Sequence, residues 1–233
     1  ADGQGCWPSR CLGMDLPCPP AAEILVVVPM GLQRRAQSSS PGNRPGFADR
    51  LATTVFGAPS LPHWCIWVEP LQAEPDRWSL RWMAGVQAAI DSWSALLPLQ
   101  RVDDPSQAQI VVWRRRPPRR QTPTGWRASN GRSHFSIREL TRAGQPRREP
   151  FVDVLVSPDL RRTALQSTAL HELGHAIGLW GHSPSKGDAL AVFQQADPVL
   201  TPSSSDRITL EWVRSQPNQF GRLGAPRRDA STD

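Results

Sequence analysis

Two segments with helical spacing of apolar residues constrain the fold of this chain more than any other feature. Apolar side chains recur at three- and four-residue steps over 76–97 and again over 158–178. Short apolar runs typical of strands lie around them, at 24–28, 64–68, 99–102, 109–113, 133–140 and 151–156. The order predicts an α+β fold in which a sheet packs on helices. Ser157 and Pro158 fit the start of the second helix, Gly178 its end, and 205–214 a last helix.

Length and composition indicate an ordinary globular protein. The 233 residues suffice for a sizeable core, and 39% hydrophobic and 21% charged residues exclude a wholly disordered chain. No apolar run approaches the roughly 20 residues that span a membrane. The 24 prolines lie mostly outside the periodic segments. We therefore expect a Pro- and Arg-rich extension over 1–60, disulfide-linked or inhibitory, a folded domain over 61–216 and a flexible tail over 217–233.

Cysteine usage bears on the compartment. Cys6, Cys11, Cys18 and Cys65 form no CxxC pair, which argues against a zinc ribbon. An even number fits disulfides in a secreted or periplasmic protein, although four reduced thiols are the alternative. Four cysteines allow three connectivities, and all three stay open.

The distribution of charged residues gives little indication of a nucleic-acid or membrane partner. The net charge is +6, and every basic residue except Lys186 is arginine. A basic loop is expected over 114–120, and it lacks the interleaved aromatic residues of a nucleic-acid site. We expect a monomer that acts on proteins or peptides and binds neither membrane nor nucleic acid.

One short segment carries the chemistry of the chain. His171 and His175 are four residues apart on a predicted helix, so both imidazoles lie on one face and can share a metal ion. Glu172 lies about 100° around the helix axis, where a carboxylate can take a proton from a water at the metal. Gly178 permits a sharp turn, and His182 after it supplies a third ligand. Three histidines leave one zinc position open, as in catalytic sites.

The sequence HELGHAIGLWGHS at 171–183 resembles the motif of the metzincin zinc peptidases, and within them the matrixins. Segments 86–94, 108–112 and 206–208 resemble the matrixin helix with a Trp-Ser end, an adjoining strand and the start of the C-terminal helix. The resemblance covers about 60–216. It implies a twisted, mostly parallel five-stranded sheet with an antiparallel edge strand, packed on two long helices. It also implies a small lower subdomain from about 179 that contains a C-terminal helix.

The chain departs from the family in several places. Gly181 adds one residue before His182, so Asp188 is an alternative third ligand. Leu190 stands where the family has a methionine beneath the metal, and a leucine of similar volume can form the same apolar floor. No calcium-binding loop is recognisable within 114–150. The segment around Cys11 faintly resembles the family's inhibitory cysteine segment, but a disulfide would occupy this thiol equally well.

These features predict a zinc endopeptidase with one catalytic Zn²⁺ and Glu172 as general base and acid. A peptide would add as an antiparallel strand along Ser133, His134, Phe135, Ser136 and Ile137. Trp180 and Leu190 would shape the pocket for the residue after the cleaved bond. The alternatives are a catalytically inactive metzincin scaffold and a basic nucleic-acid-binding protein stabilised by zinc.

Overall fold

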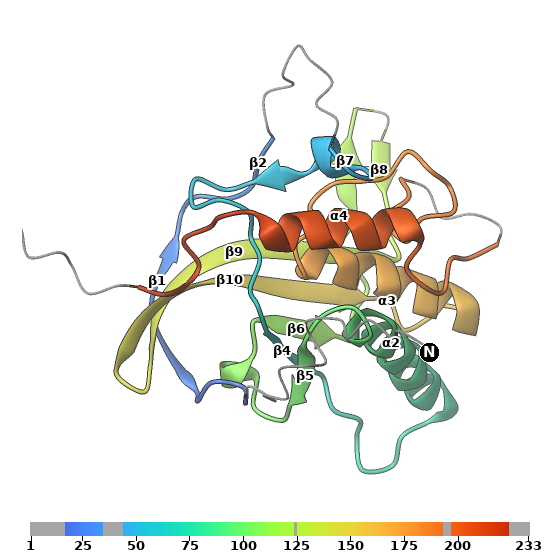
Figure 1. The fold of residues 1–233 in the computed structure, drawn as a ribbon. Helices are drawn as coiled ribbons and strands as arrows, with labels where there is room; N and C mark the ends of the chain where they lie inside the picture. The colour runs from blue at the N-terminus through green and yellow to red at the C-terminus, as the bar shows by residue number, and fades with distance from the viewer. Residues whose placement is uncertain (1–16, 35–43, 124, 193–196, 224–233) are drawn as a thin grey trace, which may run out of the picture.

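In the part of the chain that the structure describes, one large mixed sheet and three α-helices form the main body, as the apolar pattern predicts (Figure 1). The structure is a computed structural model that describes residues 17–34, 44–123, 125–192 and 197–223. Seven strands make up the sheet, with the path β1-β9-β10-β6-β4-β5 and β11 paired to β10. Their bounds are β1 Ala22–Val28, β4 Trp64–Val68, β5 Leu99–Val102, β6 Ile110–Trp113, β9 Gly131–Arg142, β10 Gln145–Val156 and β11 Gly221–Arg222.

The sheet is parallel on one side and antiparallel on the other. β10, β6, β4 and β5 run parallel to one another, whereas β1, β9 and β11 pair antiparallel. The structure therefore gives the coarse α+β class with more antiparallel pairing than the expected five-stranded arrangement. Two small ribbons stand apart from this sheet: β2 Gln33–Arg34 with β3 Ala52–Thr53, and β7 Arg120–Thr122 with β8 Gly125–Arg127.

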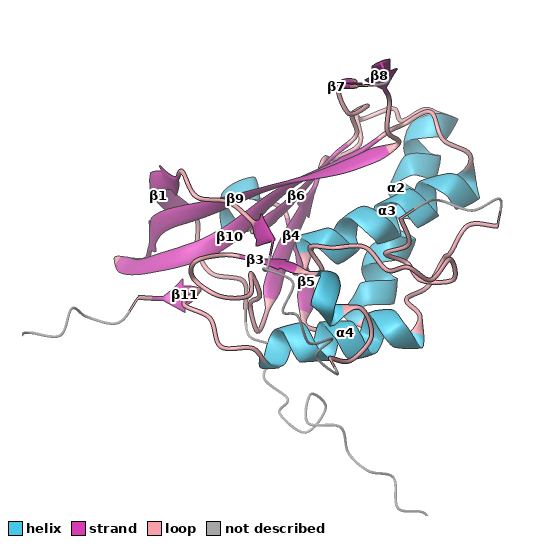
Figure 2. Cartoon of the chain, turned by 90° about the horizontal axis from the view of Figure 1, so that it is seen from above, coloured by secondary structure: helices cyan, strands magenta, loops and turns pink. Residues whose placement is uncertain are grey.

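Helices α2 (Arg77–Ser94) and α3 (Arg162–Ala176) pack against the sheet and against each other, and α4 (Ser204–Ser215) lies beyond α3 (Figure 2). Indole N–H groups of α2 tie these layers together. Trp82 Nε1 donates to the carbonyl of Val156 at 3.1 Å, and Trp93 Nε1 donates to the carbonyl of Leu170 at 2.9 Å. Trp82 thus links α2 to β10, and Trp93 links α2 to α3. Both indole rings are also buried in the apolar core.

The second helix starts later than the sequence suggested. Arg161, and not Ser157, is the N-cap of α3, because the backbone N–H of Ser157 donates to the carbonyl of Asn130 and continues the pairing of β10 with β9. Ser157 is therefore bonded at the end of β10 and does not cap the helix. The last helix lies close to its expected position, with a capping box formed by Ser203 and Asp206.

β9 and β10 form a hairpin that is longer than the expected strands. Its two-residue turn, Ala143–Gly144, has positive φ angles of 47° and 74°, as a tight hairpin with right-handed strand twist requires. Charged residues along the hairpin are paired across strands, for example Arg148 with Glu139 at 2.6 Å. These pairs allow a polar segment to continue the sheet beyond its apolar part.

Strand β1 changes the role of β9. It pairs antiparallel with the second half of β9, from Ala22 opposite Arg142 to Val28 opposite Ile137. Over 131–136, β9 pairs with β10 on one side, and no other described strand pairs with its outer side. The expected edge strand is therefore an edge along its first half only.

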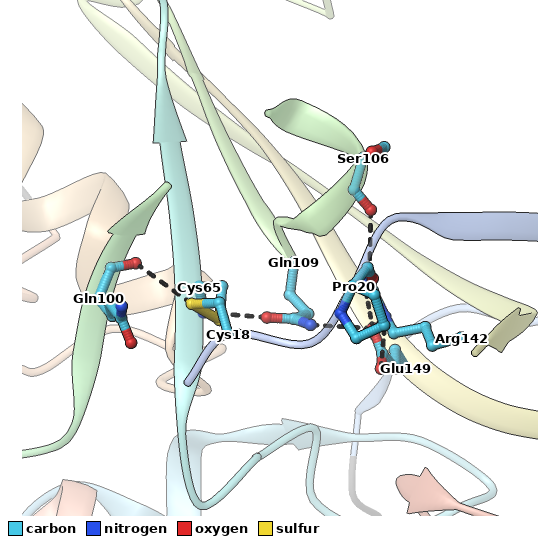
Figure 3. Close-up of a disulfide and its surroundings, with 8 residues drawn as sticks. All are labelled: Cys18, Pro20, Cys65, Gln100, Ser106, Gln109, Arg142 and Glu149. Carbon is cyan, nitrogen blue, oxygen red and sulfur yellow. Dashed lines mark hydrogen bonds and ion pairs between the residues drawn. A yellow bond between two sulfur atoms is a disulfide. The ribbon is translucent and has the colours of Figure 1, made fainter. Parts of the chain in front are cut away.

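A disulfide and a buried polar network fasten the chain that leads into β1 (Figure 3). Cys18 bonds to Cys65 on β4, and the N–H of Cys65 donates to Gln109 Oε1. Gln109 donates in turn to Glu149, which forms a buried ion pair with Arg142 at 2.9 Å. The same guanidinium donates to the carbonyl of Pro20 at 2.7 Å. Covalent and ionic bonds thus hold residues 18–20 against the sheet.

Residues 44–60 pack onto the folded body. Phe47, Leu51 and Ala58 are buried in the main apolar cluster with residues of all three helices. Cys6, Cys11 and the tail from 224 lie outside the described residues. Among the described helices, none is long and apolar enough to cross a membrane.

Candidate metal centre

Helix α3 places His171 and His175 on one face. Its middle is buried between α2 and the sheet, with Leu170, Leu173 and Ala176 fully covered. The two imidazole centroids lie 4.8 Å apart. The spacing of four residues therefore brings the rings together, as the sequence predicts.

A sharp turn after α3 brings in the third histidine. Gly178 has φ +119°, and a Cβ there would lie 3.0 Å from the carbonyl oxygen of Pro59, so glycine is required for both reasons. The ring of His182 stacks on His171 at 5.2 Å and meets His175 edge-on at 4.9 Å. One ligand atom from each of the three residues lies within 4.8 Å of the others. His182 is exposed, so the cluster faces solvent on its side.

Hydrogen bonds orient two of the three rings. His171 Nδ1 donates to the carbonyl of Ala189 at 2.8 Å, and His175 Nδ1 donates to the carbonyl of Leu179 at 2.7 Å. Both rings are thereby held as the tautomer whose Nε2 has a free lone pair. Burial lowers the pKa of His171 to about 4 and lowers the pKa of His175 well below its usual range. The cluster is therefore a set of neutral imidazoles, the form that binds metal.

Gly181, the additional residue before His182, fits because its backbone packs closely against that of Arg50. A Cβ at Gly181 would lie 2.4 Å from the carbonyl oxygen of Arg50, so only glycine allows the backbones to approach. Asp188, the alternative ligand, is occupied elsewhere. Its carboxylate accepts a 2.5 Å hydrogen bond from Ser183 Oγ and belongs to no metal-competent group among the described residues. His182 is the residue that the structure brings to the other two histidines.

The segment beneath the cluster is held by α4. Leu190 is fully buried, and a Cβ at Gly174 would lie 2.5 Å from its Cδ2, so the leucine packs against α3 between the two histidine turns. Asp206 accepts hydrogen bonds from the N–H of Ala189 at 2.7 Å and of Ser203 at 2.8 Å. Ala189 uses its carbonyl for His171. Asp206 thus positions a ligand through one intervening residue, a role that the sequence analysis missed because it depends on a contact across 17 residues.

Glu172 lies between α3 and β9. Ser133 Oγ is 2.7 Å from its Oε2 and 2.9 Å from its carbonyl oxygen. Burial raises the pKa of Glu172 to about 7, against the opposing hydrogen bonds of Ser133 and the charge of Arg132. β9 comes so close that a Cβ at Gly131 would lie 2.6 Å from Glu172 Cγ. The carboxyl is therefore confined against β9, one residue along α3 from His171.

The expected peptide-binding residues divide into two groups. Ser133 and Phe135 lie on one face of β9: the first contacts Glu172, and the ring of the second meets Trp180 at 5.3 Å. Trp180 in turn stacks on His175 at 5.6 Å. His134 is exposed and Ser136 half-buried on the open part of β9. The prediction that Ile137 binds peptide is wrong, because Ile137 is fully buried and β1 already pairs with it at Val28.

A second group with metal-ligating atoms, Cys18, His63 and Cys65, lies at the start of β4. Its two sulfurs are joined in the disulfide, which removes them as thiolate ligands. Comparison with known proteins adds no further assignment: no protein-family model and no curated protein matches this chain.

Proposed function

We propose that this protein is a zinc-dependent endopeptidase. The observation that carries the proposal is the cluster of His171, His175 and His182, whose ligand atoms lie within 4.8 Å of one another and of which His182 is exposed to solvent. A structural zinc site would fill all four positions with protein ligands. Three neutral imidazoles fit Zn²⁺ well, and two of them are held by backbone carbonyls as zinc ligands commonly are.

Bound Zn²⁺ would supply Lewis acidity toward a peptide carbonyl and toward water. The residues around it would transfer protons and hold the proton-transfer group in position. Glu172 follows a ligand on the same turn of α3 and is assigned proton transfer, first from water and then to the leaving amine. Ser133 holds that carboxylate in place by its 2.7 Å hydrogen bond.

The open half of β9 supports the assignment of a polypeptide as substrate. Residues 131–136 have an outer side that no described strand pairs, and this edge begins beside Glu172. An extended peptide can add there as an antiparallel strand and receive main-chain hydrogen bonds that do not depend on its sequence. This supports the matrixin-like assignment made from the motif, including a single catalytic zinc ion.

The Cys18–Cys65 disulfide supports secretion or export to a periplasm, since disulfides persist in oxidising compartments. The two alternative functions make different demands. A catalytically inactive scaffold does not need a buried carboxyl directly after a ligand, held by a serine of β9, as Glu172 is. A nucleic-acid-binding protein does not need an open metal position. We therefore propose a secreted or periplasmic peptidase, and its action as a monomer stays a prediction.

Peptide hydrolysis with and without chelator tests this function. The full chain, loaded with one equivalent of Zn²⁺, should cleave members of a mixed peptide library, as detected by mass spectrometry. A chelator should abolish cleavage and added Zn²⁺ should restore it. Tight zinc binding without any cleavage would instead identify an inactive scaffold.

A further inference from the structure

Strand β1 and the residues after it end the peptide-binding edge close to the metal centre. β1 pairs with β9 as far as Val28 opposite Ile137. Pro29 follows, and a proline cannot donate a ladder hydrogen bond, so the strand stops there. Six residues of β9, 131–136, are left with an open outer side among the described strands.

After β1 the chain leaves β9 and pairs with a segment that is bonded near the metal centre. β2 (Gln33–Arg34) pairs with β3, so that Arg34 lies opposite Ala52, and the N–H of Ala52 donates to the carbonyl of Trp180 at 2.8 Å. We call residues 29–34 the strap. The strap connects β1, which pairs with β9, to β3. Ala52 of β3 is hydrogen-bonded to Trp180, two residues before His182. Figure 1 shows the chain passing from β1 into β2.

The direction of a bound peptide follows from the same pairing. An antiparallel peptide on β9 runs in the direction of β1, because both run opposite to β9. Its C-terminal part lies near Gly131, and its N-terminal part points toward Ile137, where β1 already occupies the edge. A peptide and β1 would therefore lie end to end on one strand, with the strap between them.

The position of the metal centre along β9 sets the number of residues that fit. Ser133 contacts Glu172, so the cleaved bond faces this end of the open edge. The open positions left on the N-terminal side of the bond are His134, Phe135 and Ser136. Because strand pairing sets about one peptide residue against each strand residue, about three residues fit before the strap.

We propose that β1 and the strap narrow the endopeptidase activity proposed above to bonds with at most about three residues on their N-terminal side, so that the protein cleaves short peptides and near polypeptide N-termini and does not cleave far inside long chains. The inference rests on the proposed peptidase function. It concerns which peptides fit the edge and leaves the zinc ligands and Glu172 unchanged.

A length series of peptides tests the inference. Each peptide carries the same cleavable bond and the same C-terminal side, with one to eight residues and a free amino group on the N-terminal side. We expect kcat/KM of the zinc-loaded full chain to be greatest with two or three such residues and to fall at least tenfold at six or more. Equal or rising kcat/KM from three to eight residues overturns the inference.

Paired variants assign the effect to β1. Alternate residues of a strand direct their N–H toward the partner, so Val27→Pro with Val28→Pro removes at least one hydrogen bond near Ile137. This variant should cleave long peptides within about threefold of short ones. The control, Ala22→Pro with Glu23→Pro, loosens the other end of β1, opposite Arg142 and Thr141, and should keep the length dependence.

The outcomes separate this inference from the function itself. Hydrolysis that favours long N-terminal segments refutes the inference and leaves the peptidase standing. No hydrolysis of any peptide in the series refutes both. If the double variant fails to fold, as judged by circular dichroism and zinc content, the wild-type series decides alone.

Discussion

Replacing Asp206 with alanine should weaken zinc binding, although this residue is not a ligand. Its carboxylate accepts the N–H groups of Ala189 and Ser203, and the carbonyl of Ala189 holds the ring of His171. Without the carboxylate, the segment beneath the metal centre loses its tie to α4. The His171 ring then loses its fixed acceptor and part of its orientation.

The structure allows the magnitude to be worked out. A hydrogen bond to a charged group contributes about 1.5–3 kcal/mol, so the two short bonds from Ala189 and Ser203 contribute about 3–6 kcal/mol, and a third from the N–H of Leu190 is long at 3.4 Å. Burial opposes this contribution, since it raises the pKa of the fully buried Asp206 and penalises its charged form. We therefore expect Asp206→Ala to destabilise the fold by about 3 kcal/mol. Loss of an indirect partner of a metal ligand typically lowers affinity by about 10–100-fold, and we expect zinc affinity to fall in that range.

Chemical denaturation of the zinc-free protein and zinc titration against a competing chelator measure the two effects. Ser203→Ala is the matched control, because Ser203 Oγ caps α4 through the N–H of Asp206 and does not touch Ala189. It should cost about 1 kcal/mol and leave zinc affinity unchanged. If both variants bind zinc as tightly as wild type, the proposed positioning of His171 through Ala189 is incorrect.

Three further predictions follow from described contacts. Glu172→Ala should lower kcat by about 10²–10⁴-fold while retaining one equivalent of zinc, measured by metal analysis and peptide hydrolysis; lost zinc would show that the carboxyl holds the site together. His182→Ala should lower zinc affinity by orders of magnitude in a titration, whereas Asp188→Ala should not, and the reverse result would make Asp188 the ligand. Burial raises the pKa of Glu149, but its hydrogen-bonding and charged partners, Arg142 foremost, together lower it by more, so the pKa in the folded protein lies below its usual value. The ionised carboxylate therefore stabilises the fold fully above about pH 4.5, and this contribution is lost as the pH falls through the folded pKa. Glu149→Gln should therefore cost about 3 kcal/mol in denaturant at pH 7 and progressively less as the pH falls below 4.5, and a cost that does not change with pH would contradict this.

Local patterns predicted the elements that depend on local periodicity. The helical spacing over 76–97 and the alternating runs on either side are properties of each segment alone, so α2, β4 and β6 lie where they were expected. The histidine pair on α3 is a similar case, because four residues along a helix fix the relative direction of two side chains whatever surrounds them.

Features that depend on partners distant in sequence were not predictable in this way. The apolar run at 24–28 indicates a strand, but nothing in it identifies β9 as its partner. The charged residues of the β9–β10 hairpin suggest a loop, and only the cross-strand ion pairs explain why they extend the sheet. The start of α3 was misplaced for the same reason, since the bond between Ser157 and Asn130 forms across a strand pair.

The disulfide makes the stability of this fold depend on redox potential. Cys18 and Cys65 are 47 residues apart, and constraining a loop of that size in the unfolded chain contributes about 4 kcal/mol by chain entropy. That is a large share of the roughly 5–15 kcal/mol that stabilises a typical domain. Cys18 lies just before the end of β1 that pairs with Arg142, so a reduced protein would loosen first at that end of β1. Newly made chains would gain their full stability only after they reach an oxidising compartment.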